Sequence, residues 1–408
     1  MYINRVMEKR VLELAKYFPV VMVCGPRQVG KTTMLQKICS EIMDKMNYVT
    51  FDNVLLRDLA QKDPELFLQR YEPPLMIDEF QYVPELLQYI KMRVDREQKN
   101  GQYFLTGSQL FNMMSNVSES LAGRVGILQL YSLSNAELTG NDNEPFVPKE
   151  NFAAYRNLQQ RNVKEMFEKI FRGSMPRMAV YPGLSTDDFY GAYVKTYLER
   201  DIRDIINIKN ESKFLRFLSC LALRTGQELV IAELAKEVEV DNKTISNWIS
   251  VLESTGIIFL LQPFFNNALK RLVKKPKVYF LDTGLACYLS MWNNPQILEI
   301  SPMAGNIFET YVVSEIIKSY ANNGKDPRRY LYYYRDTLQR EIDLLILDSN
   351  VIYPVEIKKS TAPGEKAVKS FSVLNALGYT RGIGTVVCMT SSVMPLDREN
   401  YLVPVDEI

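Results

Sequence analysis

The sequence predicts an α/β protein of two or three domains, and three observations carry this prediction. The chain has 408 residues, which is too long for one ordinary core when a domain holds about 150 residues. Short apolar runs alternate with helical patterns over residues 1–135, as expected of a parallel sheet with crossover helices. These runs are apolar throughout rather than alternating, which is typical of strands covered on both faces.

The same patterns predict the strands of the N-terminal sheet and the limits of the domains. We expect strands at Pro19–Cys24, Tyr48–Phe51, Leu75–Ile77, Tyr103–Leu105 and Ile127–Leu130. The segment 140–150 is rich in Asn, Asp, Glu and Pro, which indicates a hinge. We therefore divide the chain into an N-terminal core (1–139), a helical linker or lid (140–210), a third domain (211–300) and a C-terminal α/β domain (301–408).

Composition excludes several classes of chemistry. Lys and Arg total 49 against 48 Asp and Glu, so any affinity for nucleic acid must come from local patches. Histidine is absent, which excludes His-based triads, His-metal sites and imidazole general bases. The five cysteines are scattered, as expected of reduced thiols. Because no apolar run resembles a secretory signal or reaches the about 18 residues of a spanning helix, we expect a cytoplasmic protein without membrane segments.

A glycine-rich motif between a buried strand and a helix is the clearest functional signal. The pattern G-x-x-x-x-G-K-[ST] is matched by Gly25, Pro26, Arg27, Gln28, Val29, Gly30, Lys31, Thr32 and Thr33. Glycines let the backbone wrap around phosphates. The backbone N–H groups of the loop and the N-terminus of the helix supply partial positive charges that bind the phosphates. In this interpretation Lys31 reaches the β- and γ-phosphates of ATP, and the Thr32 hydroxyl binds Mg²⁺.

Two carboxylates, Asp78 and Glu79, end the third expected strand. We expect Asp78 to hold Mg²⁺ through its water shell. We expect Glu79 to orient or deprotonate the water that attacks the γ-phosphate. Solvated turn residues are the alternative interpretation of such an acidic pair.

The other catalytic groups are less sharply defined. Thr106 and Ser108 end the next strand with hydroxyls, which a parallel sheet would place beside the γ-phosphate; an ordinary turn is the alternative. Hydrolysis also needs a cation on the developing charge. Arg124 and Arg200 are candidates, and either could instead form a structural ion pair. The predicted catalytic set is Lys31, Glu79, Ser108 and Arg124.

Short motifs follow one another in a specific order along nearly the whole chain. They are Gly25–Thr33, Ile77–Glu79, Leu105–Ser108, Ser120–Arg124, Arg172–Pro176, Tyr193–Asp201, Phe280–Leu285, Gly305–Glu309, Arg340–Asp343 and Val355–Lys358. With these motifs the chain resembles a broad group of prokaryotic AAA-type ATPases, in which a P-loop module precedes a C-terminal domain of uncharacterised function. It departs from the commoner pattern at Ser174-Met175, where another glycine is often found.

The resemblance implies an AAA-like core, a winged-helix middle and a C-terminal domain similar to restriction-endonuclease folds. ATPases of this kind often need an arginine from a neighbouring subunit, so a homo-oligomer is a further expectation from the resemblance.

Residues 230–261 give a helix-turn-helix followed by a strand, which is the order found in a winged helix. Ile245, Trp248, Ile249 and Leu252 recur at helical spacing and are expected in the core. The segment Lys270–Lys277 holds five cations in eight residues, and its contacts to DNA phosphates would be non-specific and salt-sensitive. Packing of this unit against other domains is the alternative.

Four charged residues of the last domain predict a metal-dependent site. Glu309 lies in an expected helix, Asp343 on a strand, and Glu356 with Lys358 on the following strand. Because Glu356 and Lys358 are two apart on a strand, they face one side, where Asp343 can meet them. Such carboxylates can share Mg²⁺ while Lys358 positions or activates water, as in metal-dependent phosphodiester nucleases. A fold that keeps this pattern without the chemistry is the alternative.

These signatures together lead to two hypotheses. The first is an Mg²⁺-dependent ATPase that couples ATP binding and hydrolysis to DNA binding by its C-terminal half. In its fullest form, this hypothesis includes DNA cleavage by the same half. The second is an ATP-controlled signalling or interaction switch with a non-catalytic nuclease-like domain. A kinase or small-molecule transferase ranks lower, because an acidic pair after a strand is the arrangement that activates water.

Overall fold

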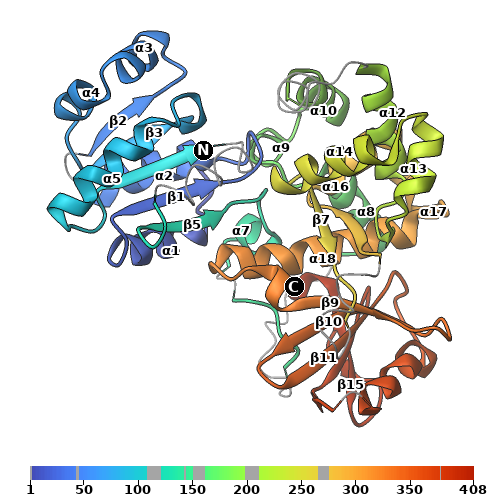
Figure 1. The fold of residues 1–408 in the computed structure, drawn as a ribbon. Helices are drawn as coiled ribbons and strands as arrows, with labels where there is room; N and C mark the ends of the chain where they lie inside the picture. Colours follow the sequence, from blue (N-terminus) through green and yellow to red (C-terminus); the bar gives the residue numbers. More distant parts are fainter. Residues whose placement is uncertain are drawn as a thin grey trace.

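The computed structural model describes residues 2–42, 46–107, 121–141, 144–149, 161–197, 211–264, 275–376 and 378–408. The described elements gather in an N-terminal α/β part, a mainly helical middle part and a C-terminal α/β part (Figure 1). In Figure 1 the N-terminal part lies on the left, and the other two lie one above the other on the right. Within the described ranges, no helix is long and apolar enough to cross a bilayer.

The N-terminal part is a parallel sheet with helices around it. Its described strands follow the order β2-β3-β4-β1-β5. They are β1 (Val20–Cys24), β2 (Asn47–Thr50), β3 (Leu75–Asp78), β4 (Tyr103–Gly107) and β5 (Val125–Gln129). Its helices are α1 (Met7–Ala15), α2 (Lys31–Ile42), α3 (Val54–Lys62), α4 (Pro64–Arg70), the 3-10 turn η1 (Phe80–Tyr82), α5 (Leu86–Glu97) and α7 (Asn135–Thr139). The predicted parallel α/β sheet is confirmed.

The central strand β1 shows why its sequence is apolar throughout. Val21 and Val23 belong to a core that includes residues of α1 and α2. Val20, Met22 and Cys24 belong to a second core that includes residues of α4 and α5. Both faces of the strand are therefore covered, which requires an apolar residue at every position.

The register of the sheet brings several predicted residues to one edge. Cys24 of β1 pairs with Gly107 of β4, and Thr50 of β2 pairs with Asp78 of β3. Because these strands are parallel, their carboxyl ends meet at the same edge. The P-loop after β1 and the acidic pair after β3 therefore leave the sheet side by side.

The middle part combines helices with a small antiparallel sheet. The helices are α8 (Val163–Arg172), α9 (Pro176–Val180), α10 (Thr186–Tyr193), α12 (Glu211–Ala222), α13 (Ile231–Val238), α14 (Asn242–Ser254), α16 (Thr283–Leu289) and α17 (Pro295–Ile300). The described strands β6 (Gln227–Glu228), β7 (Ile258–Leu261) and β8 (Lys277–Phe280) have the order β6-β8-β7. The predicted apolar stripe of α14 is buried at Ile245, Trp248, Ile249 and Leu252, so its expected place in the core is confirmed. A winged-helix domain here stays a prediction.

The C-terminal part is a mixed sheet with a long helix. The described strands follow the order β14-β15-β13-β11-β10-β9, with β12 beside β11. They are β9 (Leu331–Arg335), β10 (Glu341–Asp348), β11 (Val351–Lys358), β12 (Thr380–Arg381), β13 (Gly384–Cys388), β14 (Met394–Pro395) and β15 (Asn400–Pro404). The 3-10 segments are η4 (Pro327–Arg329), η5 (Glu365–Ala376) and η6 (Val405–Glu407). The strands β9, β10 and β11 run antiparallel, whereas β11, β13 and β15 run parallel.

Helix α18 (Ala304–Asn322) lies where the three parts meet. It contacts β5 of the N-terminal part, β8 of the middle part and β11 of the C-terminal part. In Figure 1 it crosses the centre of the molecule, below α7 and above the C-terminal sheet. Because α18 is covered on nearly every side, apolar residues occur all round it.

Candidate functional site

The P-loop takes its shape from three residues with positive φ angles. These are Gly25 at 143°, Gln28 at 63° and Gly30 at 92°. A Cβ at Gly25 would lie 2.0 Å from the carbonyl oxygen of Leu130, so only glycine fits there without a backbone shift. The loop connects β1 to α2. It therefore has the strand–loop–helix context that the motif requires.

Lys31 is buried and held against the loop itself. Its ammonium donates to the carbonyl oxygens of Gly25 at 2.9 Å and Pro26 at 2.8 Å. Burial lowers the pKa of Lys31 to about 8, although the carboxylates of Glu79 and Asp78 oppose this shift. A buried ammonium held by neutral oxygens is poorly compensated, which favours the approach of an anion.

Asp78 and Thr32 lie together, as predicted. The Thr32 hydroxyl donates to Asp78 Oδ1 at 2.8 Å. The Thr106 hydroxyl donates to the same oxygen, and the Tyr48 hydroxyl donates to Oδ2 at 3.3 Å. A hydroxyl beside a carboxylate suits Mg²⁺, an ion that takes oxygen ligands and commonly shares them with the phosphates of a nucleotide. The residues present therefore fit the expected ion.

Glu79 is held in an unusual backbone conformation at the start of η1. Its φ is 52°, in the left-handed region that a glutamate rarely adopts. Its N–H points to the Thr106 hydroxyl at 3.4 Å, and Gln81 donates to its carboxylate. Burial raises the pKa of Glu79, while Lys31 partly offsets the shift. A carboxyl group with a raised pKa accepts a proton more readily, as a general base must.

Lys31, Thr32 and Glu79 border a pocket of about 500 Å³. Its lining residues are Arg27, Gln28, Gly30, Lys31, Thr32, Thr33, Asp52, Glu79, Pro176 and Arg177. A second pocket of about 410 Å³ is also bordered by Gly30, Thr33, Pro176 and Arg177, and by Tyr2 and Tyr181. Pro176 and Arg177 begin α9, so the middle part closes one side of both pockets.

Two arginines at this site were not among the predicted residues. Arg177 is exposed and borders both pockets; its position directly after the Arg172–Pro176 motif was the only signal in the sequence. Arg5 is buried and donates to the carbonyl oxygens of Val29 at 2.7 Å and Tyr131 at 2.8 Å, and to Glu137 at 2.9 Å. Arg5 thereby connects the backbone of the P-loop to residues that are far away in the sequence.

The structure does not bring Arg124 to this pocket. Val20 of β1 pairs with Val125 of β5, so Arg124 lies at the edge where the parallel strands begin. There its guanidinium pairs with Asp95. The P-loop lies at the opposite edge, and the prediction that Arg124 serves the pocket of its own chain is therefore corrected. Ser108 and Arg200 lie outside the described residues.

The charged residues predicted for the last domain also gather. The Lys358 ammonium lies 2.5 Å from Glu356 Oε1 and 3.5 Å from Asp343 Oδ2. Burial and the Asp343 charge raise the pKa of Glu309 to about 7 and that of Glu356 to about 8. Both shifts follow from the burial of these carboxylates and from the nearby charge of Asp343.

A second lysine, which was not predicted for this cluster, comes from β8. Lys277 is 3% exposed, and its ammonium lies 3.1 Å from Glu309 Oε1 and 2.5 Å from Glu341 Oε1. The Tyr279 hydroxyl donates to Glu309 at 2.6 Å. Lys277 was expected in the DNA-contacting segment, and this assignment is corrected because a buried, paired ammonium cannot reach a phosphate.

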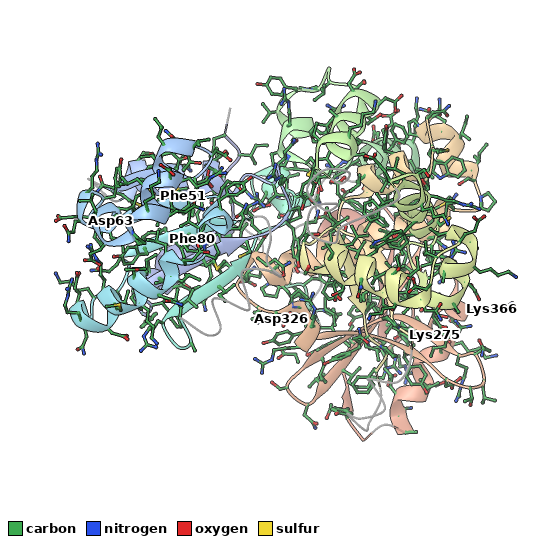
Figure 2. The ribbon with its side chains drawn as sticks, turned by 45° about the horizontal axis from the view of Figure 1, so that its top comes forward. Phe51, Asp63, Phe80, Lys275, Asp326 and Lys366 are labelled. Carbon is green, nitrogen blue, oxygen red and sulfur yellow. The ribbon has the colours of Figure 1, made fainter. Side chains whose placement is uncertain are left out.

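Of the other cations of that segment, only Lys275 lies within the described residues, and it is exposed. Figure 2 shows it on the other side of the molecule from Phe51 and Phe80, which mark the N-terminal part. Lys270, Arg271 and Lys274 lie outside the described residues. Whether the segment contacts DNA stays a prediction.

The acids of the last domain do not fit a metal centre in this arrangement. In the part of the chain that the structure describes, no group of three or more Asp, Glu or Cys side chains could hold a metal ion. Lysine ammonium groups pair directly with the carboxylates that a metal ion would need. Glu309, Asp343, Glu356 and Lys358 are therefore brought together as an ion-pair cluster.

Three family models match successive parts of the chain. An AAA domain matches residues 17–139, a domain of unknown function (DUF8612) matches 163–296, and a second domain of unknown function (DUF4143) matches 304–408. Residues 17–139 form an AAA-type domain. The descriptions of the other two family models name no activity.

Individual relatives are distant. An uncharacterised protein of Mycobacterium tuberculosis is 28% identical over 348 residues, which cover 85% of this chain and 71% of the relative. An uncharacterised protein of Methanocaldococcus jannaschii is 24% identical over 322 residues, with 72% and 66% covered. A solved Walker-type ATPase of Pyrococcus abyssi is 15% identical with a TM-score of 0.45, and the match covers 71% of this chain and 96% of that one.

A buried polar network joins the AAA domain to α18. Lys318 donates to the carbonyl oxygen of Leu133 at 2.9 Å and pairs with Glu315 at 2.5 Å. Glu315 also accepts the N–H of Asn135, the first residue of α7, at 2.6 Å. Buried charges of this kind are costly unless every group is paired, so the network fixes how α18 sits on the AAA domain.

The P-loop also touches the middle part directly. A Cβ at Gly256, which lies between α14 and β7, would come within 3.1 Å of Pro26 Cδ. Pro26 belongs to the loop whose carbonyl oxygen holds Lys31. The P-loop therefore lies against the turn that precedes β7.

Proposed function

We propose that the chain binds ATP with Mg²⁺ at the AAA domain and hydrolyses it. The observation that carries this proposal is the convergence of Lys31, Thr32 and Glu79 on one pocket of about 500 Å³, with Asp78 hydrogen-bonded to Thr32. The family match to residues 17–139 supports it. The left-handed conformation of Glu79 is a further support, because strained backbone is concentrated at functional sites.

Each residue has a separate task in this proposal. Lys31 exchanges its carbonyl partners for phosphate oxygens, and Thr32 with Asp78 holds the ion. Glu79 orients a water and accepts its proton. Arg177 adds positive charge from the middle part. Bound Mg²⁺ would neutralise charge that develops on the phosphates.

Phosphate release from ATP tests the proposal, with binding of a fluorescent ATP analogue measured in parallel. Lys31→Ala is expected to lose both activities. Glu79→Gln is expected to keep binding and lose turnover by about 100-fold or more. Lys62→Ala and Glu85→Gln are matched controls, because both side chains are exposed and neither lines the pocket. Hydrolysis that survives unchanged in Lys31→Ala would refute the proposal.

A second candidate function is an ATP-controlled switch that acts through the C-terminal part. The contact between the P-loop and Gly256, and the network that joins Asn135 to Glu315 and Lys318, favour it. Both connect the nucleotide pocket to elements outside the AAA domain. The proposal does not include DNA cleavage, which stays a prediction.

Binding of duplex DNA at low salt, with and without ATP, separates the forms of this switch. A DNA affinity that falls steeply with salt and changes with ATP would support a DNA-binding switch. We expect such a switch to act in the cytoplasm, either as a homo-oligomer or as a monomer. A slow ATPase that is indifferent to DNA would favour a protein partner. An affinity for DNA that is the same with and without ATP would contradict coupling.

A further inference from the structure

Two sequence motifs that the proposed function does not use meet next to the nucleotide pocket. They are Arg172–Pro176, which joins α8 to α9, and Phe280–Leu285, which joins β8 to α16. We propose that Asp282 of the second motif is a positioning residue of the nucleotide site. It fixes the turn Gly173–Met175 and thereby holds Arg177 of α9 at the pocket. This role rests on the proposed binding of ATP, because Arg177 acts there on the nucleotide.

The carboxylate of Asp282 binds the backbone of the turn. Its Oδ2 atom accepts the N–H of Ser174 at 2.8 Å, and the Ser174 hydroxyl lies 3.2 Å from the same oxygen. Its Oδ1 atom accepts the N–H of Leu285 at 2.9 Å, which caps α16, and the hydroxyl of Tyr190 at 2.7 Å. Asp282 is buried, and these donors are neutral. A buried carboxylate depends on such bonds, so the turn is costly to detach from it.

The turn lies in close contact with Asp282 and Tyr190. Gly173 has a φ of 73°, in the region that favours glycine. A Cβ at this position would lie 2.1 Å from the Tyr190 hydroxyl oxygen and 2.7 Å from Asp282 Oδ1, so only glycine fits there. Tyr190 is itself fully buried on α10. These two side chains therefore limit the positions that the turn can take.

The AAA domain also bonds to this turn. The carbonyl oxygen of Ser174 accepts the N–H of Leu133 at 2.9 Å. The hydroxyl oxygens of Ser174 and Ser132 lie 2.8 Å apart, within hydrogen-bond distance. Ser132 and Leu133 follow β5 and precede α7 in the AAA domain. A single residue of the turn is therefore bonded both to Asp282 and to the domain that carries the P-loop.

Helix α9 begins two residues after Ser174, and its first two residues, Pro176 and Arg177, line the nucleotide pocket. Figure 1 shows α9 between the N-terminal part and the helices of the middle part. Met175, which precedes α9, is 2% exposed, and the ring of Pro176 fixes its own φ angle. The backbone from the turn to Arg177 therefore has little freedom. Asp282 acts on the pocket through this segment, since it is not among the described residues that line the pocket.

Binding of a fluorescent ATP analogue to the full chain tests this role. Asp282→Asn keeps the size of the side chain but cannot accept all of its hydrogen bonds. Its affinity should fall about tenfold as Arg177 loses its position, and Arg177→Ala should show a similar fall. Adding Asp282→Asn to Arg177→Ala should lower the affinity by less than about a further twofold, because both changes remove the same contact. Effects that multiply in the double variant would overturn the proposal.

Asp241→Asn is the matched control, because Asp241 caps α14 in the same part of the chain, is exposed and does not line the pocket. It should bind the analogue as the wild type does. Tyr190→Phe is a second variant in case Asp282→Asn fails to fold, which circular dichroism would show. It keeps the ring but removes one donor to Asp282, so the affinity should fall about two- to fivefold. An unchanged affinity in the folded variants would overturn the proposal.

Hydrogen exchange of the α9 amides in the nucleotide-free chain separates this role from the proposed function. Exchange in α9 should be faster in Asp282→Asn than in the wild type, whereas exchange in α2 should be the same in both. If the wild type binds no ATP analogue, the proposed function fails, and exchange in α9 still decides whether Asp282 holds the turn. If the wild type binds the analogue but α9 exchanges equally fast in both proteins, only the role of Asp282 fails.

Discussion

Two groups of acidic residues, one at the AAA domain and one in the C-terminal part, each lie near lysines. The two groups differ in the partners to which these lysines donate. At the AAA domain, Lys31 lies near Asp78 and Glu79 but donates to two carbonyl oxygens. At the second group of acids, Lys277 of the middle part and Lys358 of the C-terminal part pair directly with carboxylates. The first site borders a pocket of about 500 Å³, whereas the second is closed by its own cations. A lysine held by carbonyl oxygens can exchange them for an anionic ligand, whereas a lysine paired with carboxylates is already neutralised.

The largest expected difference between the two sites is in stability. Lys277→Met should lower the free energy of unfolding by about 3–5 kcal/mol, because it leaves buried carboxylates without their cation. Lys31→Met should lower it by less, about 1–2 kcal/mol, since its hydrogen-bond partners are carbonyl oxygens and no carboxylate pairs with it directly. Urea titrations of both variants and the wild type measure this. Equal losses in the two variants would contradict the distinction.

The next effect concerns catalysis. Glu79→Gln should lower the rate of ATP hydrolysis by about 100-fold or more, because the proton acceptor is lost while the shape of the pocket is kept. Glu356→Gln should leave the rate within about twofold, since the C-terminal acids play no part at the pocket. Steady-state phosphate release checks both values. A large loss in Glu356→Gln would show that the two sites are coupled during turnover.

A third prediction concerns pH. The pKa of Glu356 is raised to about 8 in the folded chain by burial and by Asp343. The folded state therefore binds more protons than the unfolded state between about pH 4.5 and 8, so this group's stabilising contribution is lost as the pH rises. Melting temperatures from pH 5 to pH 9 should fall less steeply in Glu356→Gln than in the wild type. Parallel curves would be inconsistent with the raised pKa.

The smallest effect is expected at Arg124. Its guanidinium pairs with Asp95 at the edge of the sheet opposite the P-loop. Arg124→Ala should change the affinity for an ATP analogue by less than about twofold, because exposed ion pairs contribute little. If hydrolysis falls in this variant only at protein concentrations that allow assembly, Arg124 acts on a neighbouring subunit. A loss of binding in dilute protein would contradict the placement.

Much of the AAA domain could be predicted from local patterns. The strand before the P-loop and the residues of β3 before Asp78 are apolar because both faces of these strands are covered. Parallel strands then bring their carboxyl ends to one edge, which is why Lys31, Thr32, Asp78 and Glu79 could be predicted together. Arg124 was misassigned because a motif does not reveal at which edge of the sheet it lies.

The N-terminal sheet, the P-loop and the acids at the end of β3 could be predicted from local sequence, because short segments of continuous chain encode each of them. The positions of Arg5, Arg177 and Lys277 relative to the two sites depend on the tertiary structure, because the residues around them come from elements far apart along the chain. The tertiary structure also decided that the C-terminal acids form an ion-pair cluster. Spacing on a strand indicates which side chains share a face, but an ammonium delivered from β8 determines the charge that those side chains meet.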